Sequence, residues 1–199
     1  VYKRQSYMDS RKVKDLMVSL ENYAVIYENA TLFDAVIALE EAQAKLPPGR
    51  MKHRAVLIKD KSGKIVGKLG HLAFLKALEP KYSSLGDLKT LARAGLSAEF
   101  VNSMMETYKF WDYKFEDICR RARNIVVKDV CHPISENIDE NAPLSEAIHK
   151  FVMWQSLSIP VIRGNDIVGV LRLSDLYSEI ANVIKTTCAP DSDEPGRIK

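Results

Sequence analysis

Long apolar runs and paired cysteines are both missing from this sequence of 199 residues. No apolar run reaches the roughly 18 residues that a membrane-spanning helix needs, so we expect no insertion into a membrane. The polar, basic start has no apolar core region, which argues against a signal peptide. The three cysteines include no CxxC pair, and their odd number argues against a disulfide framework. These features predict a cytoplasmic protein.

Motifs for catalysis and metal binding are missing as well. The sequence has no Walker-type loop, GxGxxG, HExxH or nucleophile elbow, and we therefore predict that the chain is not an enzyme. Cys131 and His132 are adjacent, but neighbours on a strand point to opposite faces, and no further ligands have a suitable spacing. We accordingly predict no metal site.

A concentrated basic stripe, which is typical of nucleic-acid binders, is also missing. The formal net charge is +3, and the charges are spread along the chain. The densest basic cluster is Arg120, Arg121 and Arg123, which we interpret as the solvated face of a helix. We predict no nucleic-acid partner.

Two segments of the chain repeat the same order of elements. The first opens with Val13–Met17 and the second with the similar run Val127–Cys131. In the first repeat we predict a strand at 24–26, a helix from 32, strands at 55–58 and 65–69, and a helix at 71–78. In the second repeat we predict a helix that opens at 141–144 with Asn141 as its N-cap residue, strands at 158–162 and 167–171, and a helix capped by Ser174.

Each repeat therefore reads β-α-β-β-α, which places the chain in the α/β (α+β) class. The strands are short and rich in Val and Ile, as expected for buried strands. One unit of about 60 residues buries little surface alone, so we expect two units to share a core. The repeats span 8–78 and 127–187, a helical insert spans 79–126, and a flexible C-terminal tail spans 188–199.

The insert contains a helix that we predict from Ser97 to Asn124. Its apolar residues alternate three- and four-residue spacings, a pattern typical of two helices packed along their length. These residues are Val101, Met104, Tyr108, Trp111, Phe115, Ile118, Ala122 and Ile125. We predict a homodimer in which this seam contributes a contact. The alternative is that the same chain covers the seam.

An ordered set of short motifs resembles a known family. The run Val168–Leu176, with Ser158–Val161 before it and Cys131–Pro133 at its head, is similar to a CBS motif. The first repeat fits the same frame less closely, so the chain resembles a tandem CBS-domain protein, or Bateman module. The resemblance implies a regulatory module without a required cofactor. It also implies an adenosyl ligand between the motifs: AMP, ADP, ATP or S-adenosylmethionine.

The resemblance assigns the main ligand contact to Asp175, whose carboxylate would accept hydrogen bonds from both ribose hydroxyls. Ser174 would cap the following helix, where a phosphate also fits. Arg172 departs from the family, which has Thr or Ser there. Its guanidinium either pairs with a phosphate or binds Asp175 and closes the site. We expect Asp175→Ala to abolish ligand binding and to leave the fold intact.

The same resemblance implies contacts on both repeats. The residues are an adenine wall of His132, Pro133 and Ile134 and the strand residues Ile159 and Pro160. His53 and Arg54 would face phosphates. The alternative is that these two are surface polar residues at the end of a loop. In the first repeat Gly70 and Ala73 replace the hydroxyl and the acid, so we expect at most one nucleotide per chain.

Two functions follow from these residues. The first is a regulatory module that senses an adenosyl ligand and signals to a separate regulated protein. The second is a degenerate CBS scaffold that mediates protein–protein contact or dimerisation without a ligand. Binding of an adenosyl compound distinguishes the two.

Overall fold

The computed structural model describes residues 7–86 and 88–188, which form two compact units. The first unit holds the described residues up to 23, then 46–52 and those from 135 onward, and the second holds 24–45 and 53–134, apart from residue 87. These units do not coincide with the two sequence repeats, because the opening residues of each repeat join the sheet built by the other repeat. The mixed α and β class is confirmed.

A four-stranded sheet forms the first unit, in the order β1 (Val18–Ser19), β8 (Asp166–Arg172), β7 (Ser158–Arg163) and β6 (Ile138–Asp139). β6 and β7 are parallel, whereas β7–β8 and β8–β1 are antiparallel. The helical elements of this unit are α1 (Tyr7–Ser10), η1 (Val13–Asp15), η2 (Leu20–Asn22), α7 (Leu144–Trp154) and α8 (Leu173–Thr187). Its buried core joins the sheet to α7 and α8 through residues that include Leu144, Phe151, Ile159, Val161, Leu171 and Leu176.

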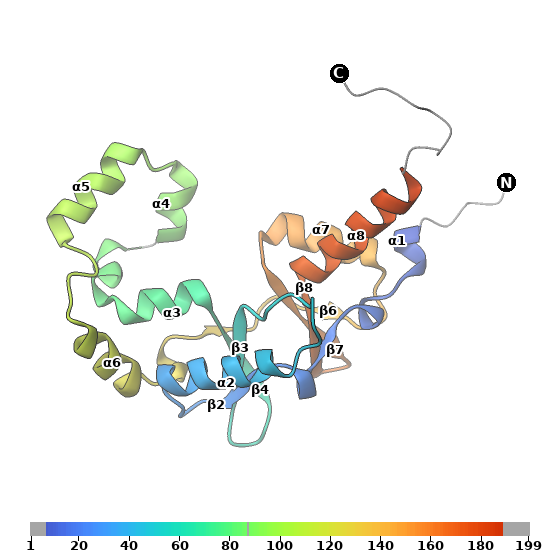
Figure 1. Ribbon diagram of the computed structural model, residues 1–199, viewed down its shortest axis with the longest axis horizontal. Coiled ribbons are helices and arrows are strands. Elements are labelled where there is room, and N and C mark those ends of the chain that lie inside the picture. The colour runs from blue at the N-terminus through green and yellow to red at the C-terminus, as the bar shows by residue number, and fades with distance from the viewer. Residues whose placement is uncertain (1–6, 87, 189–199) are drawn as a thin grey trace. The chain divides into compact units, whose positions relative to one another are not determined.

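The second unit repeats this plan with the strand order β2 (Val25–Tyr27), β3 (Ala55–Lys59), β4 (Ile65–Gly70) and β5 (His132–Pro133). β2 and β3 are parallel, and the other two pairs are antiparallel. Its helical elements outside the insert are α2 (Leu32–Ala44), α3 (His71–Leu78) and the turn η4 (Val127–Asp129). The repeated order of elements is confirmed, and Figure 1 labels the helices and most strands of both units.

A glycine in each sheet lets the strand from the other repeat approach closely. In β8, a Cβ atom on Gly169 would lie 2.6 Å from the carbonyl oxygen of Val18 in β1. In β4, a Cβ atom on Gly67 would lie 2.7 Å from the Sγ atom of Cys131, just before β5. Real Cβ atoms do not approach this closely. At Gly169 the close atom belongs to the backbone, so glycine is what allows β1 to pair with β8, whereas at Gly67 the close atom is the end of a side chain, which can move.

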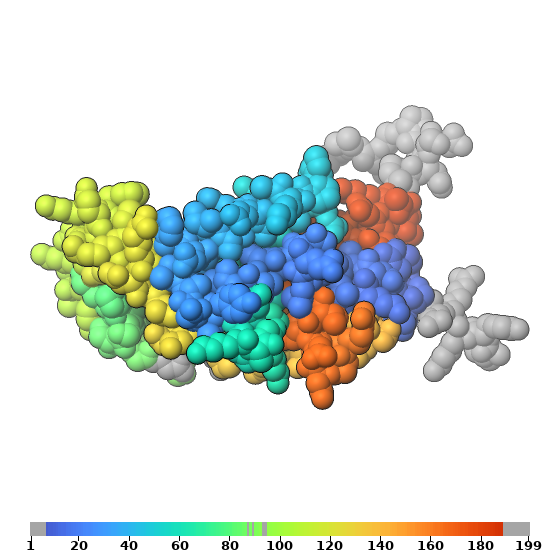
Figure 2. All heavy atoms as spheres, turned by 90° about the horizontal axis from the view of Figure 1, so that it is seen from below, coloured from blue at the N-terminus to red at the C-terminus, as the bar shows by residue number. Residues whose placement is uncertain are grey.

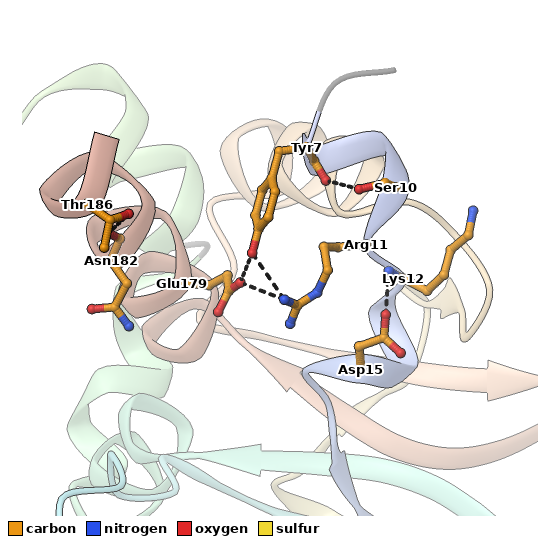
Figure 3. Close-up of polar contacts among 8 residues, drawn as sticks. All are labelled: Tyr7, Ser10, Arg11, Lys12, Asp15, Glu179, Asn182 and Thr186. Carbon is orange, nitrogen blue, oxygen red and sulfur yellow. Dashed lines mark hydrogen bonds and ion pairs between the residues drawn. The ribbon is translucent and has the colours of Figure 1, made fainter. Parts of the chain in front are cut away.

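The N-terminal segment of the first unit is held against α8. The hydroxyl of Tyr7 donates to Oε1 of Glu179 at 2.7 Å, and Nη1 of Arg11 lies 3.1 Å from the same oxygen (Figure 3). The hydrogen bond to Glu179, and after it burial, raises the pKa of Tyr7 above its ordinary value. These contacts anchor α8, whose first turn carries Asp175.

The insert consists of short helices, so the prediction of one long helix from Ser97 to Asn124 is wrong. The observed helices are η3 (Pro80–Leu85), α4 (Leu88–Ala94), α5 (Ala98–Tyr108) and α6 (Phe115–Asn124). The helical path ends between α5 and α6, where Lys109 and Trp111 have positive φ angles of 48° and 60°. Figure 1 shows α5 and α6 as separate helices joined by a connecting loop.

The buried carboxylate of Glu79 holds this break in place. Its Oε2 accepts from the backbone N–H of Trp111 at 2.7 Å. Its Oε1 accepts from the hydroxyl of Tyr113 at 3.0 Å and from the backbone N–H of Lys81 at 3.1 Å. Burial raises the pKa of Glu79, but these three hydrogen bonds outweigh burial and hold the pKa below its ordinary value.

The predicted seam is divided between two environments. Ile118, Ala122 and Ile125 on and after α6 pack against the core of their own unit, so the same chain covers this half. No residue of α5 is buried, and Val101 and Tyr108 are exposed. The atoms of α5 belong to the yellow-green surface in Figure 2. The intramolecular alternative therefore holds for Ile118, Ala122 and Ile125, whereas Val101 and Tyr108 on α5 and Phe115 at the start of α6 are exposed.

Two arginines of the basic cluster on α6 bind within their own unit. Nη1 of Arg121 donates to the carbonyl oxygen of Leu78 at 2.9 Å. The guanidinium of Arg123 lies 4.2 Å from the ring centroid of Phe33. These contacts anchor α6 to α3 and α2, which is a structural use of the charges.

Three properties of the described part of the chain bear on function. No helix in it is long and apolar enough to cross a bilayer. No three His, Cys, Asp or Glu side chains gather there into a group that could hold a metal ion. The predicted tail at 188–199 lies, apart from Cys188, outside the described residues.

Candidate functional site

A buried ion pair occupies the point where β8 passes into α8. Arg172 ends β8 and is the N-cap residue of α8, and Asp175 lies in the first turn of that helix. Nε of Arg172 donates to Oδ2 of Asp175 at 2.5 Å, and Nη2 donates to Oδ1 at 2.7 Å. Only 3% of the Arg172 side chain and 5% of the Asp175 side chain are exposed. Of the two predicted arrangements, the structure forms the one in which Arg172 binds Asp175.

The same guanidinium also binds a loop of the first unit. Nη1 of Arg172 donates to the carbonyl oxygen of Met51 at 2.5 Å. Arg50 and Lys52 flank Met51, and all three loop residues are exposed. One buried arginine therefore connects the start of α8 to an exposed loop that carries two further positive charges.

Two more buried polar residues lie beside the ion pair. Ser158 is the cross-strand partner of Arg172, so both side chains lie on the same face of the sheet. Tyr23 is buried, and burial raises the pKa of Tyr23 to about 12, although Arg172 and Ser158 act to lower it. We call Tyr23, Ser158, Arg172 and Asp175 the α8 polar cluster. Sequence analysis missed Tyr23, whose only signal is its place directly before a predicted strand.

Ser174 does not cap α8, and the prediction that it does is wrong. The helix begins at Leu173, directly after β8, and its N-cap residue is Arg172 without a side-chain cap. Ser174 therefore lies inside the first turn, where it is half-buried. Its proposed contact with a phosphate stays a prediction.

Ile159 and Pro160 point to opposite faces of β7 because successive strand residues alternate. Ile159 is fully buried in the apolar core of the first unit. Pro160 is buried on the same face as Ser158 and Arg172. Of these two predicted contacts, Pro160 shares the face of the α8 polar cluster, and Ile159 supports the sheet from the other side.

The remaining predicted contacts belong to the second unit. His53 is fully buried and Arg54 is exposed, so they do not form a pair of surface residues. That alternative is wrong for His53. His132 and Pro133 are exposed on β5, and Ile134 is half-buried. The roles of these residues toward a ligand stay predictions.

At the matching junction, the described part of the second unit has no equivalent of the ion pair. Gly70 ends β4 and is the N-cap residue of α3, which is the position that Arg172 occupies before α8. Ala73 takes the place of Asp175 and is buried. This strand–helix junction offers neither a guanidinium nor a carboxylate to a ligand.

Part of the chain matches a known protein family. Residues 127–182 match the family model of the CBS domain. This part of the chain is a CBS domain. The match includes Ser158, Arg172 and Asp175, so most of the α8 polar cluster belongs to it. No sequence among the curated proteins matches the chain significantly.

Solved structures extend the likeness to the whole fold. CBSX2, a CBS-pair protein from Arabidopsis thaliana, has been solved in complex with AMP. That complex is 16% identical, covers 86% of this chain and 97% of its own, and has a TM-score of 0.54. A CBS domain-containing protein of unknown function from Bacillus anthracis is 15% identical, with coverages of 88% and 96% and a TM-score of 0.57.

A third structure is the CBS domain of a membrane protein from Sphaerobacter thermophilus. It is 16% identical, covers 86% of this chain and 88% of its own, and has a TM-score of 0.56. At these identities the comparison establishes a shared fold. The chain thus has the fold of CBS-pair proteins, and its second repeat is also a CBS domain by sequence.

Proposed function

We propose that this chain is a regulatory module that binds an adenosyl ligand through the α8 polar cluster. The observation that supports this most is Asp175, a buried carboxylate in the first turn of α8 that accepts two parallel N–H groups. A carboxylate that accepts a forked pair of donors can accept the two hydroxyls of a ribose in the same way. The AMP complex of CBSX2 supports the class of ligand.

We further propose that each chain binds one ligand and that the module regulates through this binding, without catalysing a reaction. Only the second repeat carries the acid, since Gly70 and Ala73 occupy the equivalent positions in the first. Binding regulates by favouring one of two conformations, which requires different affinities for them. Free thiols at Cys119, Cys131 and Cys188 support a reducing cytoplasm as the location.

Titration calorimetry with AMP, ADP, ATP and S-adenosylmethionine tests the proposal. We expect one ligand per chain and stabilisation by about 2.7 kcal/mol at a ligand concentration 100 times the dissociation constant. Arg163→Met is the matched control, because it removes a mostly exposed arginine from its pair with Glu140 in the same unit and should leave the affinity unchanged. Absence of binding by all four compounds would exclude the adenosyl function.

A ligand-free scaffold is the second candidate, and the closed ion pair favours it. Both carboxylate oxygens of Asp175 are already bonded to Arg172. In a scaffold this pair is permanent, and the module serves only to bring chains together. The same titration distinguishes the two candidate functions, because a scaffold is not stabilised by any of the four compounds.

Both candidates include a homodimer. Apolar side chains are exposed on α7 and α8, including Met153 and Tyr177, and soluble monomers rarely leave many such groups uncovered. In the insert, Trp111 and Phe115 are exposed as well. Light scattering of Met153→Glu with Tyr177→Glu, and separately of Trp111→Glu with Phe115→Glu, locates the interface. A folded dimer in both double variants would contradict the proposal.

A further inference from the structure

The proposed ligand site is closed by its own arginine. A ribose that uses Asp175 must replace both hydrogen bonds from Arg172. Because Arg172 is only 3% exposed, the displaced guanidinium cannot simply be left to water. A buried charge without a partner is strongly unfavourable. Any ligand must therefore bring a new partner for Arg172, and this requirement selects among adenosyl compounds.

We propose that the Arg172–Asp175 pair is a latch that only a nucleoside phosphate opens efficiently, an inference that rests on the function proposed above. The phosphate accepts the guanidinium through its anionic oxygens in the same forked geometry as a carboxylate. The ribose hydroxyls then donate to Asp175. In this exchange both charges change partners, and neither is left buried alone.

The surroundings of the latch match an anion. Arg50 and Lys52 flank Met51, whose carbonyl oxygen lies 2.5 Å from Nη1 of Arg172. The N-terminal end of α8, which has 15 residues, also favours negative charge. S-adenosylmethionine places a sulfonium cation where AMP carries its phosphate, so the same positive charges disfavour it. Adenosine brings no charge, so it supplies no anionic partner to Arg172 in place of Asp175.

Calorimetry with four probes tests the latch: AMP, adenosine, S-adenosylmethionine and inorganic phosphate. In the wild type we expect AMP to bind at least about tenfold more tightly than adenosine, because truncating one partner of a buried charge pair costs at least this much. Arg172→Ser removes the latch and supplies the hydroxyl typical of the family. In this variant adenosine should bind more tightly than in the wild type, and the ratio between the affinities for AMP and adenosine should shrink.

A second variant keeps the test independent of the buried pair. Arg50→Ser with Lys52→Ser changes two exposed loop residues and leaves the ion pair in place. We expect this double variant to bind AMP more weakly and adenosine as the wild type does. Arg163→Met is again the control and should keep both affinities.

The outcomes separate the latch from the function on which it rests. Equal affinity of the wild type for AMP and adenosine would overturn the latch and leave an adenosyl-binding module. Inorganic phosphate that binds as tightly as AMP would also overturn it, since the ribose would then contribute nothing. No binding of any probe by the wild type or by Arg172→Ser would exclude the proposed function itself.

Discussion

Replacing Asp175 with alanine leaves the guanidinium of Arg172 buried without its carboxylate. The variant loses two charge-assisted hydrogen bonds, at 2.5 and 2.7 Å. Breaking a buried pair by removing one partner costs about 3–5 kcal/mol, of which the uncompensated charge is the main part. We therefore expect the free energy of unfolding to fall by about this amount. The expectation that Asp175→Ala leaves the fold intact stays a prediction, but the geometry adds that the folded variant should be markedly less stable.

A double-mutant cycle isolates the interaction. Arg172→Met removes the charge and leaves Asp175, which is 5% exposed, without its partner. The double variant leaves no buried charge at all, and replacing a buried pair by apolar groups is often nearly neutral. We expect the double variant to lose about 2–3 kcal/mol less than the sum of the two single variants.

The assay is urea unfolding followed by tryptophan fluorescence. Trp154 lies on α7 in the first unit, and Trp111 lies in the second. In a Trp111→Phe background, the fluorescence therefore reports on the unit that contains the ion pair. Arg163→Met is the matched control, because Arg163 binds Glu140 with the same two-fold geometry, at 2.6 and 2.9 Å.

The control differs in burial. The side chain of Arg163 is 68% exposed, although that of its partner Glu140 is only 11% exposed, so the loss of Arg163 should shift the midpoint less than the loss of Asp175. If Asp175→Ala and Arg163→Met shift the midpoint equally, burial does not strengthen the pair. If the single variants simply add in the double variant, the two side chains do not interact energetically. Either result would refute the reasoning behind the latch.

Three further predictions concern other buried features. Gly169→Ala should be strongly destabilising in urea unfolding, because its Cβ would lie 2.6 Å from the carbonyl oxygen of Val18, whereas Gly70→Ala meets nothing closer than 3.9 Å. Because the pKa of Tyr23 is raised, its contribution to stability is present below the ordinary value of 10.0 and is lost as the pH rises toward about 12. Comparing the tyrosinate absorbance of the wild type with that of Tyr23→Phe over this pH range measures the titration of Tyr23. The lowered pKa of Glu79 means that its contribution is present above the ordinary value and is lost as the pH falls, so acid should abolish the stability difference between wild type and Glu79→Gln.

The order of strands and helices could be predicted because its signals are local. Runs rich in Val and Ile, such as 55–58 and 158–162, coincide with β3 and β7 almost to the residue. The opening run Val-Lys-Asp occurs twice and forms a similar turn each time, with Val13 and Val127 fully buried. Patterns of this kind depend on burial of one face of an element, which neighbouring residues encode.

The break in the insert could not be predicted because its cause is distant in the chain. The apolar spacing from Val101 to Ile125 is regular enough for one helix. Glu79 lies far upstream, yet its carboxylate binds the backbone of Trp111 and thereby stabilises the non-helical connection. The spacing of apolar residues does not show where a helix ends, and two short helices carry the same spacing as one long helix does.

In the candidate site too, contacts between neighbours in the sequence could be predicted and contacts between distant residues could not. Arg172 and Asp175 are three residues apart at a strand–helix junction, so the sequence alone could suggest that they meet. Tyr23 and Met51 are distant in sequence, and Met51 contributes only a backbone carbonyl, which any residue could supply. The chemical identity of a backbone partner leaves no trace in a sequence.

The two repeats suggest how the charges at this junction are controlled. In the second repeat an arginine and an aspartate occupy the start of the helix together, and both are buried. In the first repeat Gly70 and Ala73 occupy the equivalent positions, so both charges are absent. A buried junction tolerates a complete pair or no pair, since half a pair leaves a charge without compensation. Arg172 and Asp175 therefore act as one unit, and a ligand that engages one must also satisfy the other.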